Sequence, residues 1–472
     1  MKDYICSGLR ALIGGLLLLQ ISVAGVSAQS PTISVKDFGA KGDGSTDDVS
    51  AIQAAIDSLP YGGTVFFPAG TYMLGTSSGG VGVFPDWTPI QTALIVRTDN
   101  VLLTGEGNQS ILKLMPNAKM RVISVISSNV IFEKITVDGS KANRDGSVPW
   151  PDGDVVDGLL YAYSSAKNVT FRYCEVRNAI EDGIGFWQSD DSLVHDCYSH
   201  DNGTAQAGGA GISLSRGKSA KAINNTVISN TATGIWSAFG SNDVLIKDNL
   251  IENNSKGGIT IGGSTFENGL SDQNNGFIII GNTIRGNGRD VFPALTVFSS
   301  KNGTISENTV IDNYYDGIQF SDEGSIPSTD WLIENNQCSN TDSERKQDFG
   351  IRILGLSNNI NLQGNTCANN GTGLDYQIVI ENESAVNSNW REVNTINYTV
   401  PPLPTPTFTP TPTPTGNDIQ GDIDGDGDVD IFDYNILIEN FGSTSCGNIA
   451  DIDGNCKVDI FDYNLLVENF GK

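Results

Sequence analysis

The run "DGIGF", from Asp182 to Phe186, decides the fold because variants of it recur along the middle of the chain. Each copy has a glycine, then an isoleucine, then a residue that is expected to point outward. In most copies a second apolar residue follows. The other copies are "AGISL" from Ala210, "TGIWS" from Thr233, "GGITI" from Gly257, "DGIQF" from Asp316 and "FGIRI" from Phe349. Between the copies lies an asparagine, a short apolar strand and another asparagine, as in "NNTVISN" and "GNTIRGN".

This spacing predicts stacked coils. Glycines 183, 211, 234 and 258 are 28, 23 and 24 residues apart, and a coil of that size buries its apolar side only against its neighbours. The recurrent asparagine indicates an internal ladder of hydrogen-bonded amides at a turn. No helical pattern of about 10 to 15 residues separates the strands, which argues against an α/β fold. We therefore expect an all-β solenoid, a parallel β-helix.

Four cysteines follow the same repeat. Cys174 and Cys197 occupy the first asparagine site of their coils, and Cys338 and Cys367 share the next inward site. We expect four stacked, buried thiols, with disulfides as the alternative.

The N-terminal stretch "VKDFGAKGDGSTDDVSAIQAAIDSLPYGGTVFFPAGTYML", Val35 to Leu74, contains a short amphipathic helix between Asp47 and Ser58. Together with "NVLLTGEGNQSILKL" from Asn100, this stretch resembles the opening of the pectate-lyase-like, right-handed β-helix superfamily. The resemblance implies that the helix caps the first coil of a β-helix over residues 30–400. It does not fix the chemistry, because that superfamily includes lyases, hydrolases, epimerases and phage tailspikes.

The outward positions of the repeated strands predict a surface ladder and, on it, a candidate site. The ladder residues are Gly185, Ser213, Trp236, Thr260, Gln319 and Arg352, with Trp187, Ser215 and Ala238 two positions further on. Trp187 and Trp236 are predicted to form a platform for sugar rings, or else to shield a loop. Asp157, Asp182 and Asp316 each precede a strand glycine. Neighbouring carboxylates at Asp157 and Asp182 suit acid–base chemistry, although aspartate is also a common turn residue before glycine.

The sequence is compared with the needs of two kinds of catalysis, hydrolysis and lyase-type elimination. "EDGIGF" and "FGIRIL" resemble strands of the polygalacturonase family, which places Asp182 on a catalytic carboxylate and Arg352 on a substrate-binding arginine. The other residues that this family requires are replaced by Gly209, Ala210, Gly257 and Leu354. An inverting hydrolase needs two carboxylates, one on each side of the scissile bond. The loss of the other residues therefore makes hydrolysis a weaker prediction than a lyase reaction.

A lyase needs a base near the sugar C5 proton and a cation beside the adjacent carboxylate. "SRGKSAK" supplies Arg216 and Lys218 just after a strand. The predicted catalytic residues are thus Asp182, Asp157, Arg216 and Lys218, and the predicted substrate-binding residues are Trp187, Trp236, Arg352 and Asp316. His195 and His200 are the only histidines, and we expect both to be solvated surface residues, with a catalytic role as the alternative.

The proline- and threonine-rich segment 401–417 predicts a stiff linker before an acidic tail, residues 418–472. The tail contains "DIDGDGDVDIFD" and "DIDGNCKVDIFD", which have the ligand order of twelve-residue calcium loops. Two calcium ions are expected. The predicted ligands are Asp422, Asp424, Asp426, Asp428 and Asp433 in the first loop, and Asp451, Asp453, Asn455, Lys457 and Asp462 in the second. Asp428 and Lys457 would bind through their backbone carbonyls.

Aspartate at position twelve, followed by one helix per loop, resembles a dockerin domain, a small all-α module. The resemblance implies binding to a cohesin module through Ile431, Phe432, Ile460 and Phe461. Cys456 stands where the first loop has a glycine, and it could form a disulfide with Cys446.

Charge and the N-terminus limit the partners and the compartment. A formal net charge of −27 and an isoelectric point near 4.2 argue against a nucleic-acid partner. Residues 1–28 have the basic start, apolar core and small cleavage residues of a secretory signal, with an uncleaved anchor as the alternative. No later stretch is apolar enough to cross a membrane. The sequence predicts a secreted lyase-type enzyme acting on an acidic polysaccharide, with a glycoside hydrolase or a non-catalytic carbohydrate-binding or adhesion protein as alternatives.

Overall fold

The structure is a computed structural model. It describes residues 30–83, 88–116, 118–143, 158–163, 165–204, 209–262, 264–265, 271–289, 292–321, 326–341, 346–398, 420–425 and 427–470. The chain divides into two compact units, Met1–Val400 and Pro401–Lys472. The predicted signal at residues 1–28 and the linker at 401–417 lie outside the described residues.

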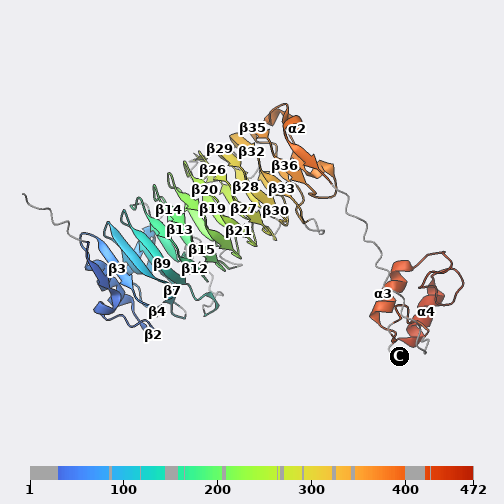
Figure 1. The fold of residues 1–472 in the computed structure, drawn as a ribbon, viewed down its shortest axis with the longest axis horizontal. Helices are drawn as coiled ribbons and strands as arrows, with labels where there is room; N and C mark the ends of the chain where they lie inside the picture. Colours follow the sequence, from blue (N-terminus) through green and yellow to red (C-terminus); the bar gives the residue numbers. More distant parts are fainter. Residues whose placement is uncertain are drawn as a thin grey trace, which may run out of the picture. The chain divides into compact units, whose positions relative to one another are not determined.

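The first unit is a parallel β-helix, as the repeat predicts (Figure 1). One wall is a 12-stranded sheet, called sheet B, formed mainly by the "G-I-x" strands. Its strands are β5 (Gly79–Val83), β6 (Thr88–Val96), β8 (Arg121–Val125), β10 (Leu160–Tyr163), β13 (Ile184–Trp187), β16 (Ile212–Ser215), β19 (Ile235–Ala238), β22 (Ile259–Gly262), β28 (Leu295–Phe298), β31 (Ile318–Phe320), β34 (Ile351–Ile353) and β37 (Ile378–Ile380). All of them pair in parallel except β5, which is antiparallel to β6.

The remaining walls belong to a 24-stranded sheet, called sheet A, which turns a corner within most coils. The strands before the corner are β3 (Gly63–Phe67), β11 (Thr170–Arg172), β14 (Leu193–His195), β17 (Lys221–Ile223), β20 (Leu245–Lys247), β26 (Ile278–Ile280), β29 (Ser300–Ser306), β32 (Thr329–Glu334) and β35 (Asn358–Gln363). Those after it are β4 (Gly70–Leu74), β12 (Glu175–Arg177), β15 (Tyr198–His200), β18 (Thr226–Ile228), β21 (Leu250–Glu252), β27 (Thr283–Arg285), β30 (Thr309–Ile311), β33 (Gln337–Ser339), β36 (Thr366–Ala368) and β38 (Thr395–Asn397). β7 (Val101–Leu114) and β9 (Ile131–Asp138) run through the corner. The remaining strands are β1 (Thr32–Ser34), β2 (Asp43–Asp47), β23 (Ser264–Thr265), β24 (Ser271–Asp272) and β25 (Asn274–Asn275).

A helix covers the first coil, as predicted for residues 47–58. Helix α1 (Val49–Asp57) buries Ile52, Ala55 and Ile56 in the core. The Gln53 side chain hydrogen-bonds both the N–H and the C=O of Ile95, each at 2.9 Å. Gln53 therefore satisfies backbone groups of β6 that would otherwise be buried without partners. The other short helices of this unit are η1 (Val35–Phe38), η2 (Lys141–Asn143), η3 (Leu374–Tyr376), η4 (Glu383–Ala385) and α2 (Trp390–Val393).

The predicted amide ladder is present at the corner of sheet A, and a second ladder follows the strands after that corner. In the first, each side-chain oxygen accepts hydrogen bonds from the backbone N–H and the side-chain amide of the preceding member. Its members are Asn225, Asn249, Asn282, Asn308, Asn336, Asn365 and Asn394. The second contains Asn202, Asn230, Asn254, Asn287 and Asn313 and continues through Gln347 and Asn370. Each ladder replaces water as the partner of buried amides.

The prediction for the four cysteines is confirmed. Cys174, Cys197, Cys338 and Cys367 are buried free thiols. Cys197 begins the first ladder, because its N–H donates to Asn225 Oδ1 at 3.0 Å. Cys338 and Cys367 lie opposite each other in register.

The second unit has two short helices, α3 (Ile431–Asn440) and α4 (Ile460–Asn469). Its small core contains Val429, Leu437, Ala450, Val458 and Leu466, drawn from both halves of the sequence repeat. A disulfide joins Cys446 and Cys456, the pairing that the sequence suggests.

Candidate functional site on sheet B

The outward positions of sheet B form one column. The register of the strands aligns Tyr161, Gly185, Ser213, Trp236, Thr260, Thr296, Gln319 and Arg352. The alignment is as predicted, but the exposure is not, because Ser213 and Gln319 are buried, at 2% and 7% exposed. Ser215 and Ala238 are also buried. Sequence periodicity predicts which residues point outward but does not reveal that neighbouring parts of the chain bury them.

Near the first coils, Asp182 belongs to a buried polar cluster. It accepts hydrogen bonds from the Tyr161 hydroxyl and from the Ala210 N–H, the latter at 2.7 Å. The Arg121 guanidinium lies 5.2 Å from the Tyr161 ring centre and 4.8 Å from that of Tyr163. This cluster joins the predicted Asp182 to three residues that the sequence did not single out.

Glycines make room for this cluster. A Cβ at Gly158 or at Gly185 would overlap the ring of Tyr161. The ring therefore lies flat over the next strand and directs its hydroxyl to Asp182. The absence of a side chain at Gly185 is what allows this close approach.

Burial controls protonation in the cluster. Burial raises the pKa of Asp182, although the bonds from Tyr161 and Ala210 and the charge of Arg121 oppose the shift. Burial and the nearby Asp182 charge raise the pKa of Tyr161 well above its ordinary value. A carboxyl group with a raised pKa beside a tyrosine hydroxyl can accept and return a proton, which is the requirement for acid–base catalysis.

Beside this cluster lies an aromatic platform, defined here as Trp187, Arg216, Trp236 and Phe239. The Phe239 ring centre is 5.6 Å from that of Trp187 and 5.4 Å from that of Trp236. The Arg216 guanidinium lies 5.7 Å from the Trp187 ring centre and 5.9 Å from that of Phe239. Among the described side chains, Trp187 is one that keeps a buried ring N–H without a hydrogen-bond partner. Predicted residues Trp187, Trp236 and Arg216 are thus brought together.

The backbone beneath the platform makes a left-handed turn directly after each strand. Arg216 and Phe239 both have positive φ, 62° and 61°. Bulky residues rarely adopt this conformation, and the repeat imposes it here, because Gln188 and Ser299 have φ of 55° and 47° directly after other strands of sheet B. Phe239 was missed by the sequence analysis because it lies one residue past the strand, outside the repeated pattern.

Asp316 and Arg352 meet in a second cluster further along the same sheet. Arg352 lies 3.6 Å from Asp316 and 3.6 Å from Glu381, and Gln319 donates to Asp316 at 2.5 Å. Burial raises the pKa of Asp316 to about 6, with Arg352 and Gln319 opposing the shift. The predicted substrate-binding arginine is therefore already paired with two carboxylates.

The two clusters do not form one hydrolytic pair. Asp182 and Asp316 are five strand steps apart along β13, β16, β19, β22, β28 and β31, or roughly 24 Å at the usual strand spacing. Hydrolysis requires carboxylates within about 5 to 10 Å. The position next to Asp182 in the following coil is Ala210.

Other predicted residues lie elsewhere. Asp157 lies outside the described residues, and the register Leu160–Ile184 places Gly158 opposite Asp182. The Lys218 side chain is 67% exposed, 3.9 Å from Asp243, and is not part of the platform. His195 and His200 are on sheet A, each bonded to an aspartate at 2.6 Å.

In the second unit, carboxylates converge in both acidic loops. Side-chain oxygens of Asp422, Asp424 and Asp433 lie within 4.8 Å of one another, and so do those of Asp451, Asp453 and Asp462. Asp433 and Asp462 are fully buried, and each accepts three backbone N–H bonds, which fixes its orientation. Hard carboxylate oxygens at this separation fit a calcium ion.

The rest of each predicted ligand set is less defined. Asp428 forms a further carboxylate group with Asp430 and Asp433. Asn455 and Lys457 are exposed in the second loop, and Asp426 lies outside the described residues. Of the predicted partner-binding residues, Phe461 is 62% exposed. Ile431, Phe432 and Ile460 begin the two helices, and their side chains lie outside the described part of the chain.

Two family models match the first unit. "Rhamnogalacturonase A/epimerase, pectate lyase-like" matches residues 32–261, and "Right handed beta helix region" matches residues 260–390. The first unit thus has the right-handed β-helix fold, and its first half is similar to pectate-lyase-like proteins. No helix in the described segments is long and apolar enough to cross a membrane.

Known proteins extend this comparison. The chain is 31% identical over 202 residues to mannuronan C5-epimerase AlgE1 of Azotobacter vinelandii, covering 39% of this chain and 13% of that protein. It is 33% identical over 186 residues to alginate lyase 7 of the same organism, an alignment that covers 36% of this chain and 20% of that protein. The chain thus spans a fifth or less of the length of these relatives. The A-module structure of mannuronan C5-epimerase AlgE6 of A. vinelandii aligns with a TM-score of 0.56 and 21% identity, covering 78% of this chain and 97% of that one. That likeness shows the fold.

Proposed function

We propose that the β-helix acts on an acidic, uronate-rich polysaccharide bound along sheet B. The observation that carries the proposal is the aromatic platform with Arg216 among its rings, beside the Tyr161–Asp182 pair. Aromatic faces stack on sugar rings, and a guanidinium forms paired hydrogen bonds with a carboxylate. The relatives named above, a mannuronan epimerase and an alginate lyase, support a uronate as the sugar.

The chemistry proposed is removal of the C5 proton next to the uronate carboxylate. Arg216 pairs with the carboxylate and withdraws charge from C5, and Asp182 takes the proton, directly or through the Tyr161 hydroxyl. In a lyase, the C5–H electron pair forms a C4–C5 double bond and the C4–O4 bond breaks, its electrons leaving with the oxygen. The buried Arg121 stabilises the negative charge on the Tyr161–Asp182 pair.

A second candidate is a non-catalytic carbohydrate-binding or adhesion protein. It is favoured by one observation, the burial of Tyr161 and Asp182, which are 1% and 6% exposed. In that case the pair supports the platform and does not touch the sugar. A glycoside hydrolase is favoured less, because the position aligned with Asp182 in the following coil is Ala210, where the polygalacturonase pattern requires a carboxylate.

Product analysis separates these functions. The purified chain is incubated with alginate, pectate and a neutral glycan. Unsaturated products absorbing in the ultraviolet identify a lyase, a changed C5 configuration without cleavage identifies an epimerase, and new reducing ends alone identify a hydrolase. For either C5 reaction, Asp182→Asn and Tyr161→Phe should lower the rate by about 100-fold or more, while Asp375→Asn, an exposed control, leaves it unchanged. Alginate binding without products in every assay supports the second candidate.

We further propose that the chain is secreted and that the second unit is a calcium-dependent dockerin that binds a cohesin on a scaffold or cell surface. Two observations support the dockerin proposal: both loops resemble dockerin calcium loops, and the carboxylates of each loop lie within 4.8 Å of one another. Calcium supplies the positive charge that lets the acidic loops fold tightly. The test is calcium titration of the chelator-treated chain, followed by heteronuclear NMR of residues 420–470. Two ions per chain are expected, and Asp424→Ala with Asp453→Ala should abolish both, because alanine offers no ligand oxygen. An unchanged spectrum on chelation contradicts the proposal.

A further inference from the structure

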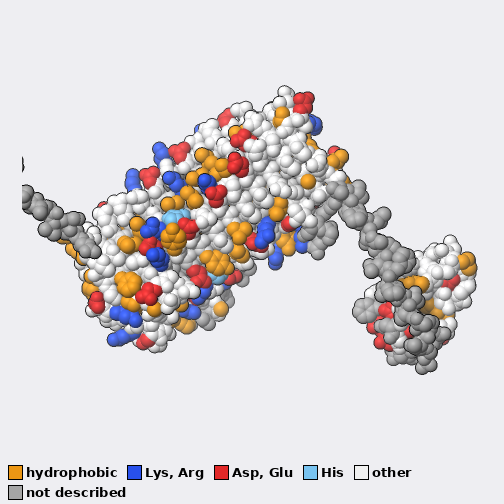
Figure 2. Space-filling view, viewed as in Figure 1, with side chains coloured by type: hydrophobic (Ala, Val, Ile, Leu, Met, Phe, Trp, Pro, Cys, Tyr) orange, Lys and Arg blue, Asp and Glu red, His pale blue; other side chains and the backbone are white. Residues whose placement is uncertain are grey.

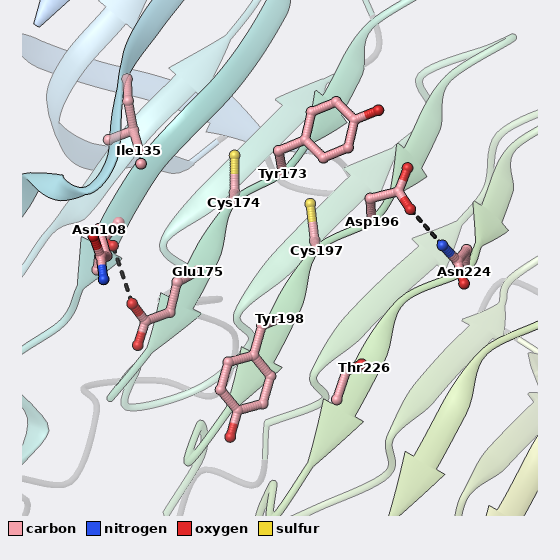
Figure 3. Close-up of a pocket in the computed structure, with 12 residues that line it drawn as sticks. Asn108, Ile135, Tyr173, Cys174, Glu175, Asp196, Cys197, Tyr198, Asn224 and Thr226 are labelled. Atoms are coloured by element: carbon pink, nitrogen blue, oxygen red, sulfur yellow. Dashed lines mark hydrogen bonds between the residues drawn. The ribbon is translucent and has the colours of Figure 1, made fainter.

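A hollow on sheet A, away from the platform, has the form of a second sugar site. A cavity of about 500 Å³ lies at the corner between the strands β11, β14 and β17 and the strands β12, β15 and β18. Tyr173 and Tyr198 lie on its two sides, and Asn108, Glu175, Asp196 and Asn224 are among its polar residues (Figure 3). None of these residues belongs to sheet B. In Figure 2, charged and hydrophobic side chains surround the pale blue histidines on this face.

Both tyrosine rings are exposed and held in place. Tyr173 is 51% exposed and Tyr198 is 41% exposed. Tyr198 stacks on His200 with ring centres 4.0 Å apart, and the edge of Tyr173 meets His195 at 5.5 Å. The chain's only two histidines thus each support one tyrosine.

The histidines are themselves fixed by carboxylates. Nδ1 of His195 lies 2.6 Å from Asp196, and Nδ1 of His200 lies 2.6 Å from Asp201. Nε2 of His200 is 3.2 Å from Glu175. A tyrosine ring held in this way presents a flat face with little loss of side-chain entropy on binding.

Tyr173 also occupies a strained position. Its φ is +54°, a conformation that bulky side chains rarely adopt. Other coils place residues suited to that conformation at the same corner, such as Asp196, Asn224 and Gly281. The tyrosine costs stability there, which is expected where a side chain serves binding.

The charges of the hollow select among sugars. The hydrogen bond from His195 lowers the pKa of Asp196. Burial acts to raise the pKa of Glu175, but the bonds from His200, Arg177 and Thr136 and the charge of Arg177 outweigh it and lower the pKa. Glu175 is ion-paired with Arg177 at 2.5 Å, but no Lys, Arg or His is among the residues that line the hollow, so the lining offers a uronate no cationic partner. Carboxylates and amides together accept and donate hydrogen bonds to hydroxyl groups.

We propose that this hollow binds a neutral, hydroxyl-rich polysaccharide, stacked on Tyr173 and Tyr198 and hydrogen-bonded to Glu175, Asp196 and Asn224. The site is separate from the sheet B platform and does not depend on its proposed function. It gives the chain a second glycan contact, which prefers a neutral glycan to an acidic one.

The test uses affinity electrophoresis of the full chain in gels containing soluble neutral polysaccharides (xyloglucan, galactomannan, β-glucan) or alginate. Each tyrosine is replaced by the residue at the same position of a later coil, Tyr173→Asn as in Asn224 and Tyr198→Thr as in Thr226. Each change should weaken retardation by a neutral glycan about tenfold or more, since it removes an aromatic ring that the bound sugar would cover. Tyr61→Ala removes a tyrosine that is 93% exposed and serves as the control.

Tyr173→Asn carries a second readout. Relief of the strained φ should raise the midpoint of thermal unfolding while neutral-glycan binding falls, a combination that a purely structural tyrosine would not give. Retardation by alginate should be unchanged in both variants. The proposal is overturned if no neutral polysaccharide retards the wild-type chain, if both variants bind it as the wild type does, or if alginate binding falls in parallel.

Discussion

Replacement of Asn282 by alanine should strongly destabilise the β-helix. Asn282 lies in the middle of the first amide ladder and is 1% exposed. Its Oδ1 accepts from the backbone N–H and the side-chain amide of Asn249, both at 2.9 Å. Its Nδ2 donates to the Ile246 carbonyl and to Asn308 Oδ1, also at 2.9 Å. Alanine removes these four bonds at once, together with a longer one of 3.2 Å from Nδ2 to the Ile280 carbonyl.

The expected cost follows from the groups left behind. A buried N–H at Asn249 without an acceptor costs about 1–3 kcal/mol, and the other lost bonds contribute about 1 kcal/mol each or less, so we expect about 3–5 kcal/mol in total. The neighbouring strands β20 and β26 should loosen together, because the ladder joins successive coils.

Urea unfolding followed by circular dichroism measures the loss, and hydrogen exchange with mass spectrometry locates it at residues 245–250 and 278–285. The control is Asn358→Ala, an exposed asparagine on β35, which should change stability by less than about 0.5 kcal/mol. A cost below about 1 kcal/mol for Asn282→Ala, or exchange unchanged at Asn249, would refute the reasoning that the ladder holds the coils together.

Three further predictions concern protonation, packing and the platform. Asp316 has its pKa raised from 3.8 to about 6, so folding binds a proton. The stabilisation that this proton gives the folded chain is complete below about pH 4 and is lost as the pH rises through 6, roughly 3 kcal/mol in all. In Asp316→Asn the midpoint of urea unfolding should therefore depend less on pH between pH 4 and 7. A pH dependence equal to that of the wild type contradicts this. Gly185→Ala should displace the Tyr161 ring at a cost of about 1–3 kcal/mol, visible by near-ultraviolet circular dichroism, whereas Gly373→Ala, where a Cβ meets nothing within 4 Å, should have little effect. Arg216→Ala should weaken alginate binding about tenfold or more and reduce its salt dependence, measured by calorimetry, with Lys218→Ala as the matched control; equal losses in both would show that only net charge matters.

The sequence was sufficient for features that repeat. The period of the "G-I-x" strands predicted the stacked coils, and the recurrent asparagines predicted a ladder that joins residues about 24 to 33 positions apart. The stacked thiols of Cys338 and Cys367 followed from the same register. Each of these depends on one local rule applied again in every coil.

The site was harder to predict because it depends on departures from the repeat. Tyr161 reaches Asp182 only because Gly185 has no side chain, a contact between coils that no local pattern encodes. Phe239 completes the platform from a strained residue beyond the strand. The outward residues of sheet B were expected to be exposed, yet Ser213 is buried. Strand periodicity does not determine the path of the segments around it. The resemblance found by sequence indicated the fold, whereas the pairing of Arg352 with Asp316 and Glu381 required the structure.

The most direct test of the account is hydrogen exchange of the full chain with and without a short alginate oligosaccharide. Protection should appear on sheet B at residues 184–188, 212–216 and 235–239, next to Trp187, Arg216 and Phe239, and should be lost in Arg216→Ala. Protection confined to sheet A, or none at saturating oligosaccharide, would contradict the claim that sheet B binds an acidic glycan.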